Sequence, residues 1–350
     1  MTRKLSRRDF IGQARSVALA TPCLSLLGCG EEAREDLVSL NGTTMGTTYS
    51  LKLVDVPSRI DVAALADEVD AVLETVNRQM STYRQDSEIS AFNRAAAGAW
   101  APLSGDSRAV IEEALRVSRL TGGAFDPTVG PVIDLWGFGP DAGEPRVPSA
   151  EEIAAAHRMV GYTQLETRET PTAAAKHLAG LRLDLSGVAK GFGVDQVAQY
   201  LAARGIENHL VEVGGELRTA GHGPSGQAWR IGIEKPTAKP GDLQRVVELT
   251  DQGLATSGDY RLFFEREGRH YSHIVDPKTG RPVEHNLASA TVVADTTMEA
   301  DALSTSLLVL GPEAGMALAE AHDIAAFFIA ASGEAFTASA SPAFDRRFTT

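Results

Sequence analysis

Residues 298–305 read Met298-Glu299-Ala300-Asp301-Ala302-Leu303-Ser304-Thr305. This stretch indicates both a helix of the fold and a candidate site for its chemistry. It lies between strand-like runs at 288–293 and 325–330, so we expect a helix among strands. On a helix, Asp301 and Thr305 lie one turn apart on the same face. Mg²⁺ prefers such oxygen ligands, takes one or two carboxylates from the protein, and leaves its other positions to water and substrate phosphates. The stretch predicts a magnesium site and phosphate chemistry; the alternative is a solvated helix face.

Helical periodicity and capping residues predict the other helices. Apolar residues recur at helical spacing from Asp61, a typical N-cap residue, to Met80. Ser149 and Glu152 form a capping box that opens a helix expected to close at Gly161. Further helices are expected from about 106 to the Gly122-Gly123 stop and at about 191–203, 298–310 and 312–322.

Strand-like runs dominate the second half of the chain. They are expected at 181–185, 209–213, 229–234, 245–249, 270–275, 288–293 and 325–330, after an N-terminal pair within 37–54 that turns at Asn41-Gly42. The turn sequence Asp276-Pro277-Lys278-Thr279-Gly280 favours antiparallel hairpins. We therefore predict an α+β fold of mixed and antiparallel sheets with packed helices, with 142–148 as an exposed loop.

The N-terminus has the pattern of an export signal. Ser6-Arg7-Arg8-Asp9-Phe10-Ile11 is a twin-arginine pattern, and the apolar run at 16–28 is too short for a stable membrane anchor. Leu26-Leu27-Gly28-Cys29 resembles the bacterial lipobox, where cleavage leaves the cysteine as a lipid-modified N-terminus. We expect a signal at 1–28, a tether at 29–37 and a folded domain at 38–345; Sec export or a soluble export signal are the alternatives.

Composition restricts the partners of the mature protein. Cys23 lies inside the signal and Cys29 would carry lipid, so no thiol remains for a disulfide. Residues 1–28 carry a net charge of +4 within a whole-chain charge of −13, which leaves −17 on the mature part. Such an acidic surface argues against nucleic acids and anionic membranes as partners, so an anionic ligand must be received by backbone amides, a local cation or a metal.

Two glycine-containing segments have backbone suited to a phosphate or a polar ring. Residues 183–193 run from a strand-like stretch into a helix through three glycines, so their free amides and Lys190 can meet phosphate oxygens. Residues 122–131 form a loop dense in glycine and proline, in which Asp126 can accept from a ligand. The structural alternatives are an ordinary strand-to-helix turn and a helix stop.

Three further side chains suit a planar, phosphate-bearing ligand. His273 precedes a turn and suits an acid, base or phosphate-donor role, with a histidine bonded to backbone as the alternative. Met45 and Tyr83 suit contact with a ring, with core packing as the alternative. The sequence has no Cys and His residues at the spacings typical of zinc sites, and it has no Gly-x-Ser-x-Gly nucleophile motif.

Nine motifs in order resemble the ApbE family of FAD:protein FMN transferases over about residues 38–330. They are Met45-Gly46-Thr47; Met80-Ser81-Thr82-Tyr83 with Ser87-Glu88-Ile89-Ser90-Ala91-Phe92-Asn93; Gly123-Ala124-Phe125-Asp126; Leu135-Trp136-Gly137-Phe138-Gly139; 184–190; Val213-Gly214-Gly215-Glu216; Ala255-Thr256-Ser257-Gly258-Asp259-Tyr260; His273-Ile274-Val275-Asp276-Pro277; and Ala300-Asp301-Ala302-Leu303-Ser304-Thr305. The order makes the set more specific than any single motif.

The resemblance implies a T-fold-like architecture with the active site in a cleft between two subdomains. It implies that FAD is bound by Met45, Tyr83, Ala124, Phe125, Asp126, Asp184, Lys190 and Ile274. It implies a metal held by Asp301, Thr305 and the backbone oxygen of Gly187, with His273 and Asp301 as catalytic residues. The chain has Phe192 where many relatives carry Tyr, and Gly187 where some carry Thr or Ser.

The implied reaction is Mg²⁺-dependent transfer of FMN from FAD to a threonine hydroxyl of an acceptor protein, with release of AMP. The implied partners are FAD and an acceptor subunit of a membrane redox complex that carries a threonine-containing motif. The implied location is the periplasmic face of the inner membrane, with a lipid anchor at Cys29. The base that accepts the proton of the threonine hydroxyl is either His273 or a carboxylate near the metal. The alternatives are an FAD pyrophosphatase that gives FMN and AMP, and a flavin-binding lipoprotein without turnover.

Overall fold

The computed structural model describes residues 37–237, 241–259, 262–333 and 335–348. The expected export signal at 1–28, Cys29 and nearly all of the tether therefore lie outside the described residues. An eight-stranded sheet forms the centre of the fold, and each strand runs antiparallel to its neighbours. Its strands, in spatial order, are β1 (Val38–Thr44), β2 (Thr47–Val54), β6 (Asn208–Val213), β7 (Glu216–Ala220), β10 (Gly253–Gly258), β15 (Leu287–Ala294), β16 (Ala325–Ser332) and β17 (Ala335–Ala340).

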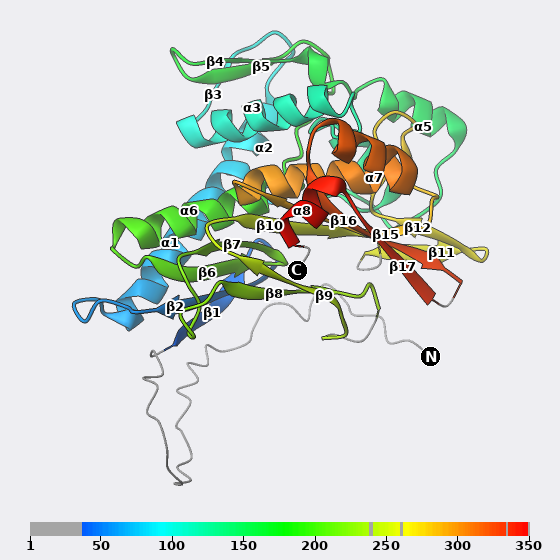
Figure 1. Ribbon diagram of the computed structural model, residues 1–350. Coiled ribbons are helices and arrows are strands. Elements are labelled where there is room, and N and C mark those ends of the chain that lie inside the picture. Colours follow the sequence, from blue (N-terminus) through cyan, green and yellow to red (C-terminus); the bar gives the residue numbers. More distant parts are fainter. Residues whose placement is uncertain (1–36, 238–240, 260–261, 334, 349–350) are drawn as a thin grey trace, which may run out of the picture.

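Helices cover one face of this sheet (Figure 1). They are α1 (Val62–Met80), α6 (Ala189–Ala203) and α7 (Thr297–Ala321). The α6 helix packs on β6 and β7, α7 packs on β10 and β15, and α1 packs against α6. The apolar stripe predicted for α1 is buried there, and Asp61 caps the helix by accepting from the backbone N–H of Ala63 at 2.9 Å.

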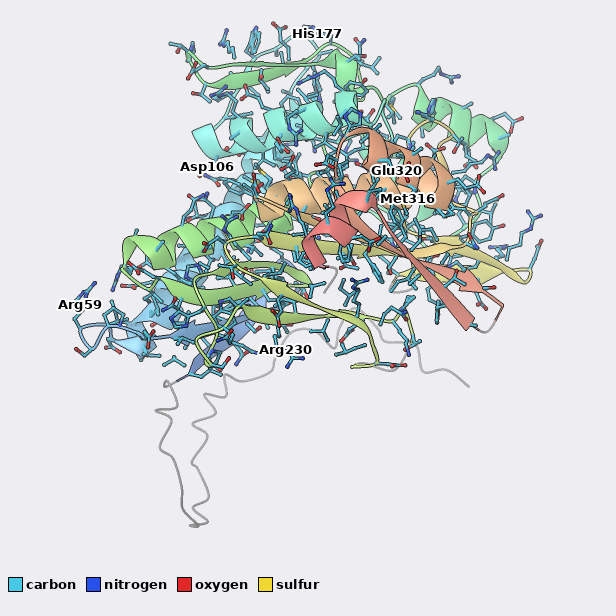
Figure 2. The ribbon with its side chains drawn as sticks, viewed as in Figure 1. Arg59, Asp106, His177, Arg230, Met316 and Glu320 are labelled. Carbon is cyan, nitrogen blue, oxygen red and sulfur yellow. The ribbon has the colours of Figure 1, made fainter. Side chains whose placement is uncertain are left out.

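A β-hairpin and the C-terminal helix cover the opposite face of the sheet. The hairpin pairs β8 (Trp229–Glu234) with β9 (Leu243–Leu249), and the helix is α8 (Pro342–Phe348). Their buried side chains, including Trp229 and Phe344, pack with those of the sheet in one apolar cluster. Central strands such as β15 are thus buried on both faces, whereas charged residues such as Arg59, His177 and Arg230 point outward at the periphery (Figure 2).

A second group of elements lies on the far side of α7, at the top of Figure 1, where α3 contacts α7. It contains helices α2 (Glu88–Arg94), α3 (Gly105–Leu120), α4 (Gly130–Trp136) and α5 (Ala150–His157), the short helix η1 (Tyr162–Gln164), and a small sheet of β3 (Ala101–Pro102), β5 (Ala173–Lys176) and β4 (Leu165–Arg168). Two further hairpins pair β11 (Phe263–Arg266) with β12 (Arg269–Ser272) and β13 (Val275–Asp276) with β14 (Arg281–Pro282). The predicted α+β class is confirmed.

The long helix α7 is interrupted where the sequence predicts a break between two helices. Gly311 has a φ of 79°, a conformation that glycine adopts without strain, and a Cβ there would lie 2.6 Å from the His285 ring. Among the described residues, α7 is also the one helix long and apolar enough to cross a membrane. Its contacts with the sheet and with α3 account for that composition, because a helix covered on several sides has few polar positions.

The predicted N-terminal turn is wrong. The chain turns at Met45-Gly46, whereas Asn41-Gly42 lies inside β1. Gly42 pairs with Tyr49 across the hairpin, and a Cβ at Gly42 would lie 2.4 Å from the Tyr49 ring. The glycine therefore accommodates an aromatic ring within the sheet.

Other expected boundaries also change. Residues 181–185 form no strand; they contain an isolated bridge from Arg182 to Val129, and Asn93 hydrogen-bonds the backbone of Leu183. The α5 helix has the predicted capping box but ends at His157, before Gly161. The run 270–275 divides between β12 and β13, and β7 and β10 were not anticipated. Residues 142–148 lack regular structure and are mostly exposed, as predicted.

Candidate active site

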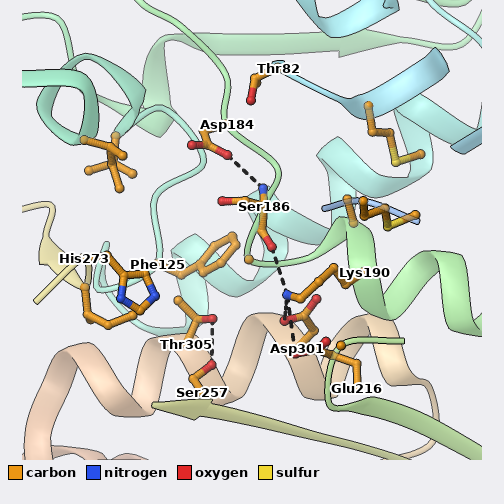
Figure 3. A pocket seen from close by; sticks show the side chains of 18 of the residues that line it. Thr82, Phe125, Asp184, Ser186, Lys190, Glu216, Ser257, His273, Asp301 and Thr305 are labelled. Atoms are coloured by element: carbon orange, nitrogen blue, oxygen red, sulfur yellow. Dashed lines mark hydrogen bonds and ion pairs between the residues drawn. The ribbon is translucent and has the colours of Figure 1, made fainter. Parts of the chain in front are cut away.

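A cavity of about 1110 Å³ lies between α1, α7 and the strands β7 and β10 on one side and the loop segments 81–84, 124–129, 184–187 and 273–277 on the other. Every residue that the sequence predicted for the site lines it: Met45, Tyr83, Ala124, Phe125, Asp126, Asp184, Gly187, Lys190, His273, Ile274, Asp301 and Thr305. Figure 3 shows several of these side chains converging from separate loops onto the first turns of α7. The volume slightly exceeds the range typical of small-molecule sites, so a large ligand fits.

The α7 helix is held in place by α6 at the point where Asp301 enters the cavity. Asp195 of α6 accepts from the backbone N–H groups of Thr297 and Met298 at 3.0 and 2.9 Å, which caps the start of α7. The backbone N–H of Gly191 donates to Asp301 Oδ2 at 3.0 Å. A Cβ at Gly191 would lie 2.3 Å from the Thr297 oxygen, so the two helices approach this closely only because residue 191 is glycine.

Asp301 shares its surroundings with Lys190 and Glu216. Lys190 Nζ lies 3.4 Å from Glu216 Oε1 and 3.7 Å from Asp301 Oδ1, and it donates to the Ser186 oxygen at 3.3 Å. Asp301 and Glu216 are 2% and 4% exposed. Burial raises the pKa of both carboxyl groups, and the nearby Lys190 charge opposes that rise in pKa for each.

This arrangement suits an added cation. Glu216 Oε2 is buried and has no hydrogen-bond partner among the described residues. Two buried carboxyl groups face one ammonium, so a divalent cation nearby would favour their charged forms. In the described part of the chain, no group of three or more His, Cys, Asp or Glu residues is arranged so that it could hold a metal ion. That small carboxylate set fits Mg²⁺, which relies on water and substrate phosphates for its remaining ligands.

Thr305 and Gly187 complete the predicted ligand set. Thr305 lies one turn after Asp301 on α7, as its spacing predicted. Gly187 approaches it closely, since a Cβ on Gly187 would lie 3.4 Å from Thr305 Oγ1 and 3.1 Å from the Phe125 ring. A larger residue at 187 would therefore crowd the Phe125 ring, and glycine keeps the backbone close to the Thr305 hydroxyl. The oxygen donors present fit a magnesium ion.

His273 is held in a defined tautomer. Its Nδ1 lies 2.9 Å from the Leu262 oxygen, and because a carbonyl only accepts, Nδ1–H is the donor. Burial lowers the pKa of His273, and the positive charge of Lys190 lowers it further. The hydrogen bond to Leu262 raises this pKa and offsets part of the effect. The neutral ring then carries its lone pair on Nε2. In Figure 3 His273 lies on the same side of the site as Phe125 and Thr305.

Two predicted carboxylates accept hydrogen bonds from the protein itself. Asp126 accepts from the backbone N–H and hydroxyl of Thr128 at 2.8 and 2.6 Å and from the N–H of Tyr162 at 3.1 Å. Asp184 accepts from the Ser186 N–H at 2.9 Å. Both residues line the cavity. Their hydrogen bonds stabilise the loops around the cavity, whose backbone amides can then face a ligand.

The remaining predicted residues form the apolar parts of the cavity. Phe125 and Ala124 are buried, and Tyr83 is 70% exposed on the lining. Met45 adopts a φ of 49° in the β1–β2 turn, and its side chain lies against α6 at Gly193. Ile274, on the segment between β12 and β13, is buried. These contacts suit a ligand with a large ring system.

The structure adds two residues that the sequence motifs contained without a role. Glu216 begins β7 and faces Lys190, and Ser257 of β10 hydrogen-bonds Thr305 at 3.1 Å. The glycine pair before Glu216 was a usable signal, because it predicts a close approach of the backbone. No local pattern marks Ser257, since its contact depends on the packing of β10 against α7.

The sequence profile described as "ApbE family" matches residues 45–328. The chain belongs to the ApbE family. It is 46% identical over 328 residues to the FAD:protein FMN transferase of Vibrio cholerae, an alignment that covers 94% of this chain and 97% of that protein. It is 42% identical over 345 residues to the FAD:protein FMN transferase of Haemophilus influenzae, with 97% and 98% covered.

Solved ApbE structures agree with this assignment. The crystal structure of the Pseudomonas stutzeri flavinyl transferase ApbE in its apo form is similar with a TM-score of 0.84 at 42% identity, over 92% of this chain and 99% of that one. The ApbE resemblance inferred from the nine motifs is therefore confirmed, and so is the ApbE-like architecture.

Proposed function

We propose that this ApbE-family chain is an Mg²⁺-dependent FAD:protein FMN transferase that moves FMN from FAD to a threonine hydroxyl of an acceptor flavoprotein subunit and releases AMP. The observation that carries the proposal is the convergence of the predicted flavin and metal residues on one cavity, with Asp301 and Thr305 on the same face of α7. The names of its relatives in Vibrio cholerae and Haemophilus influenzae support the reaction class.

The proposed reaction is a displacement at the FMN phosphorus of FAD. The acceptor hydroxyl oxygen forms a bond to that phosphorus, and the bond from phosphorus to the bridging oxygen breaks. AMP leaves with the bridging oxygen and its electron pair. When bound by Asp301, Thr305 and the Gly187 oxygen, Mg²⁺ would neutralise charge on the pyrophosphate.

The chain's own residues supply positioning and proton transfer. His273, neutral and with Nε2 unprotonated, can take the proton of the acceptor hydroxyl. Lys190 places an ammonium group beside Asp301 for the pyrophosphate oxygens. Phe125 and Tyr83 offer ring faces for the flavin or the adenine.

The setting of the reaction is part of the proposal. The signal and lipobox in the sequence support an exported lipoprotein anchored through Cys29 on the periplasmic face of the inner membrane. An acceptor subunit of a membrane redox complex would meet the cavity there.

The test mixes the purified mature domain with FAD, Mg²⁺ and a purified acceptor subunit, followed by denaturing electrophoresis. Flavin fluorescence on the acceptor band that disappears with chelator or with a threonine-to-alanine acceptor supports the transferase. Free FMN and AMP without labelling would instead indicate a pyrophosphatase, and unchanged FAD would indicate a flavin-binding protein.

A further inference from the structure

Three hydroxyl groups form a continuous chain beside the proposed metal site. Thr305 Oγ1 lies 3.1 Å from Ser257 Oγ, and Ser257 Oγ lies 2.9 Å from Ser304 Oγ. Ser304 Oγ donates to the backbone oxygen of Asp301 at 3.0 Å. The chain thus starts at one proposed ligand residue and ends on the backbone of the other (Figure 3 shows the Thr305–Ser257 contact).

The direction of every hydrogen bond in this chain follows from its end. A carbonyl oxygen only accepts, so the single proton of Ser304 is committed to Asp301. Ser304 must then accept from Ser257, and Ser257 must accept from Thr305. Each hydroxyl has one proton, so no other orientation satisfies all three contacts.

Thr305 lacks the alternative that helical hydroxyl groups usually have. Ser306, its neighbour, donates to the carbonyl four residues earlier, that of Ala302, at 2.7 Å. The corresponding carbonyl for Thr305 is that of Asp301, whose two lone pairs are used by the N–H of the helix and by Ser304. In the described part of the chain, the hydroxyl of Thr305 has its hydrogen bond to Ser257 alone.

We infer that Ser257 is a positioning residue that accepts the hydrogen bond of the Thr305 hydroxyl and so leaves the lone pairs of Thr305 Oγ1 for a divalent cation. Removing a group that hydrogen-bonds a metal ligand typically lowers the affinity for the metal about 10–100-fold. Ser257 comes from β10, which packs directly on α7, so the sheet sets the orientation of a ligand on the helix. This inference rests on the metal assignment within the proposed function.

The test is a Mn²⁺ titration followed by loss of the electron paramagnetic resonance signal of free Mn²⁺, on the mature domain without FAD and again with excess FAD. Ser257→Ala should raise the Mn²⁺ dissociation constant about tenfold. Ser257→Thr, which keeps the hydroxyl, should restore affinity to within about twofold of the unsubstituted protein. Ser306→Ala is the matched control, because it removes a buried hydroxyl from the same helix that does not touch Ser257.

Ser304→Ala tests the inferred direction of the hydrogen bond from Thr305 to Ser257. Without Ser304, the Ser257 proton loses its acceptor and can turn toward Thr305, so we expect a Mn²⁺ affinity between those of the unsubstituted protein and Ser257→Ala.

Thermal unfolding of every variant separates loss of affinity from loss of fold. Equal Mn²⁺ affinity in Ser257→Ala and the unsubstituted protein would overturn the inference alone. Absence of Mn²⁺ binding by the unsubstituted protein would overturn the metal assignment and this inference together, whereas FMN transfer is measured separately.

Discussion

The backbone N–H of Gly191 on α6 donates to the carboxylate of Asp301 on α7 at 3.0 Å. This contact joins the helix that carries Lys190 to the helix that carries Asp301 and Thr305. It satisfies one lone pair of Asp301 Oδ2 and leaves Oδ1 toward Lys190. The carboxylate is therefore oriented by the scaffold before any ligand arrives.

Asp301→Asn tests the role of that charge. The amide oxygen can still accept from Gly191, so we expect the fold to be retained. Loss of the negative charge should lower Mg²⁺-dependent kcat/KM at least about 100-fold, because several kcal/mol of metal-assisted charge stabilisation is lost. AMP release measures turnover, and quenching of FAD fluorescence measures binding, which should change little. Full turnover in this variant would exclude Asp301 as a ligand.

Glu216→Gln tests the buried carboxyl group through stability. Burial raises the pKa of Glu216 above its ordinary 4.5, so the folded protein keeps a proton that the unfolded chain releases. Stability should therefore fall as the pH rises above 4.5 toward the raised pKa. The glutamine variant should lose less stability between pH 5 and 8, by more than about 1 kcal/mol, since one unit of pKa is worth about that much.

Urea denaturation in the presence of a chelator measures this difference. The exposed Glu248→Gln is the control, because it removes the same charge from the surface. An unchanged pH dependence in Glu216→Gln would show that Glu216 does not hold its proton in the folded state.

His273→Asn tests the proposed base. Burial lowers the pKa of His273 below its ordinary 6.5, so the ring is neutral and able to accept a proton above that lowered value. We expect kcat/KM of the unsubstituted enzyme to decline only at a pH below 6.5. The variant should lose about 10²–10⁴-fold in kcat, and this acidic decline should disappear. If the pH–rate profile of the variant kept the decline, a different group would be the base.

Cys29→Ser tests the lipid anchor. Cys29 has no role in the proposed chemistry, so FMN transfer by the variant should match that of the unsubstituted protein within about twofold, while the protein should move from the membrane to the soluble fraction. Cell fractionation with immunodetection checks the location. Retention in the membrane fraction would contradict the lipoprotein proposal.

Local periodicity predicted much of the fold because helix geometry acts over short distances in the sequence. The stripe and cap of α1, the capping box of α5 and the break in α7 at Gly311 were all visible in the chain. The turn at Met45-Gly46 was not, because Asn41-Gly42 is a stronger local turn signal. The packing of the Tyr49 ring over Gly42 decides against it, and that contact exists only once β1 and β2 pair.

The sequence by itself determined that Asp301 and Thr305 share a face, because residues four apart on a helix always do. Only the tertiary structure decided which groups surround them. Glu216 and Ser257 reach the site because β7 and β10 are neighbours in the sheet and α7 packs across it. Their contacts with Lys190 and Thr305 span 26 and 48 residues of chain. At such separations strand pairing and helix packing set the neighbours of a side chain, so the glycine pair before Glu216 could predict a close approach of the backbone but not its contact with Lys190.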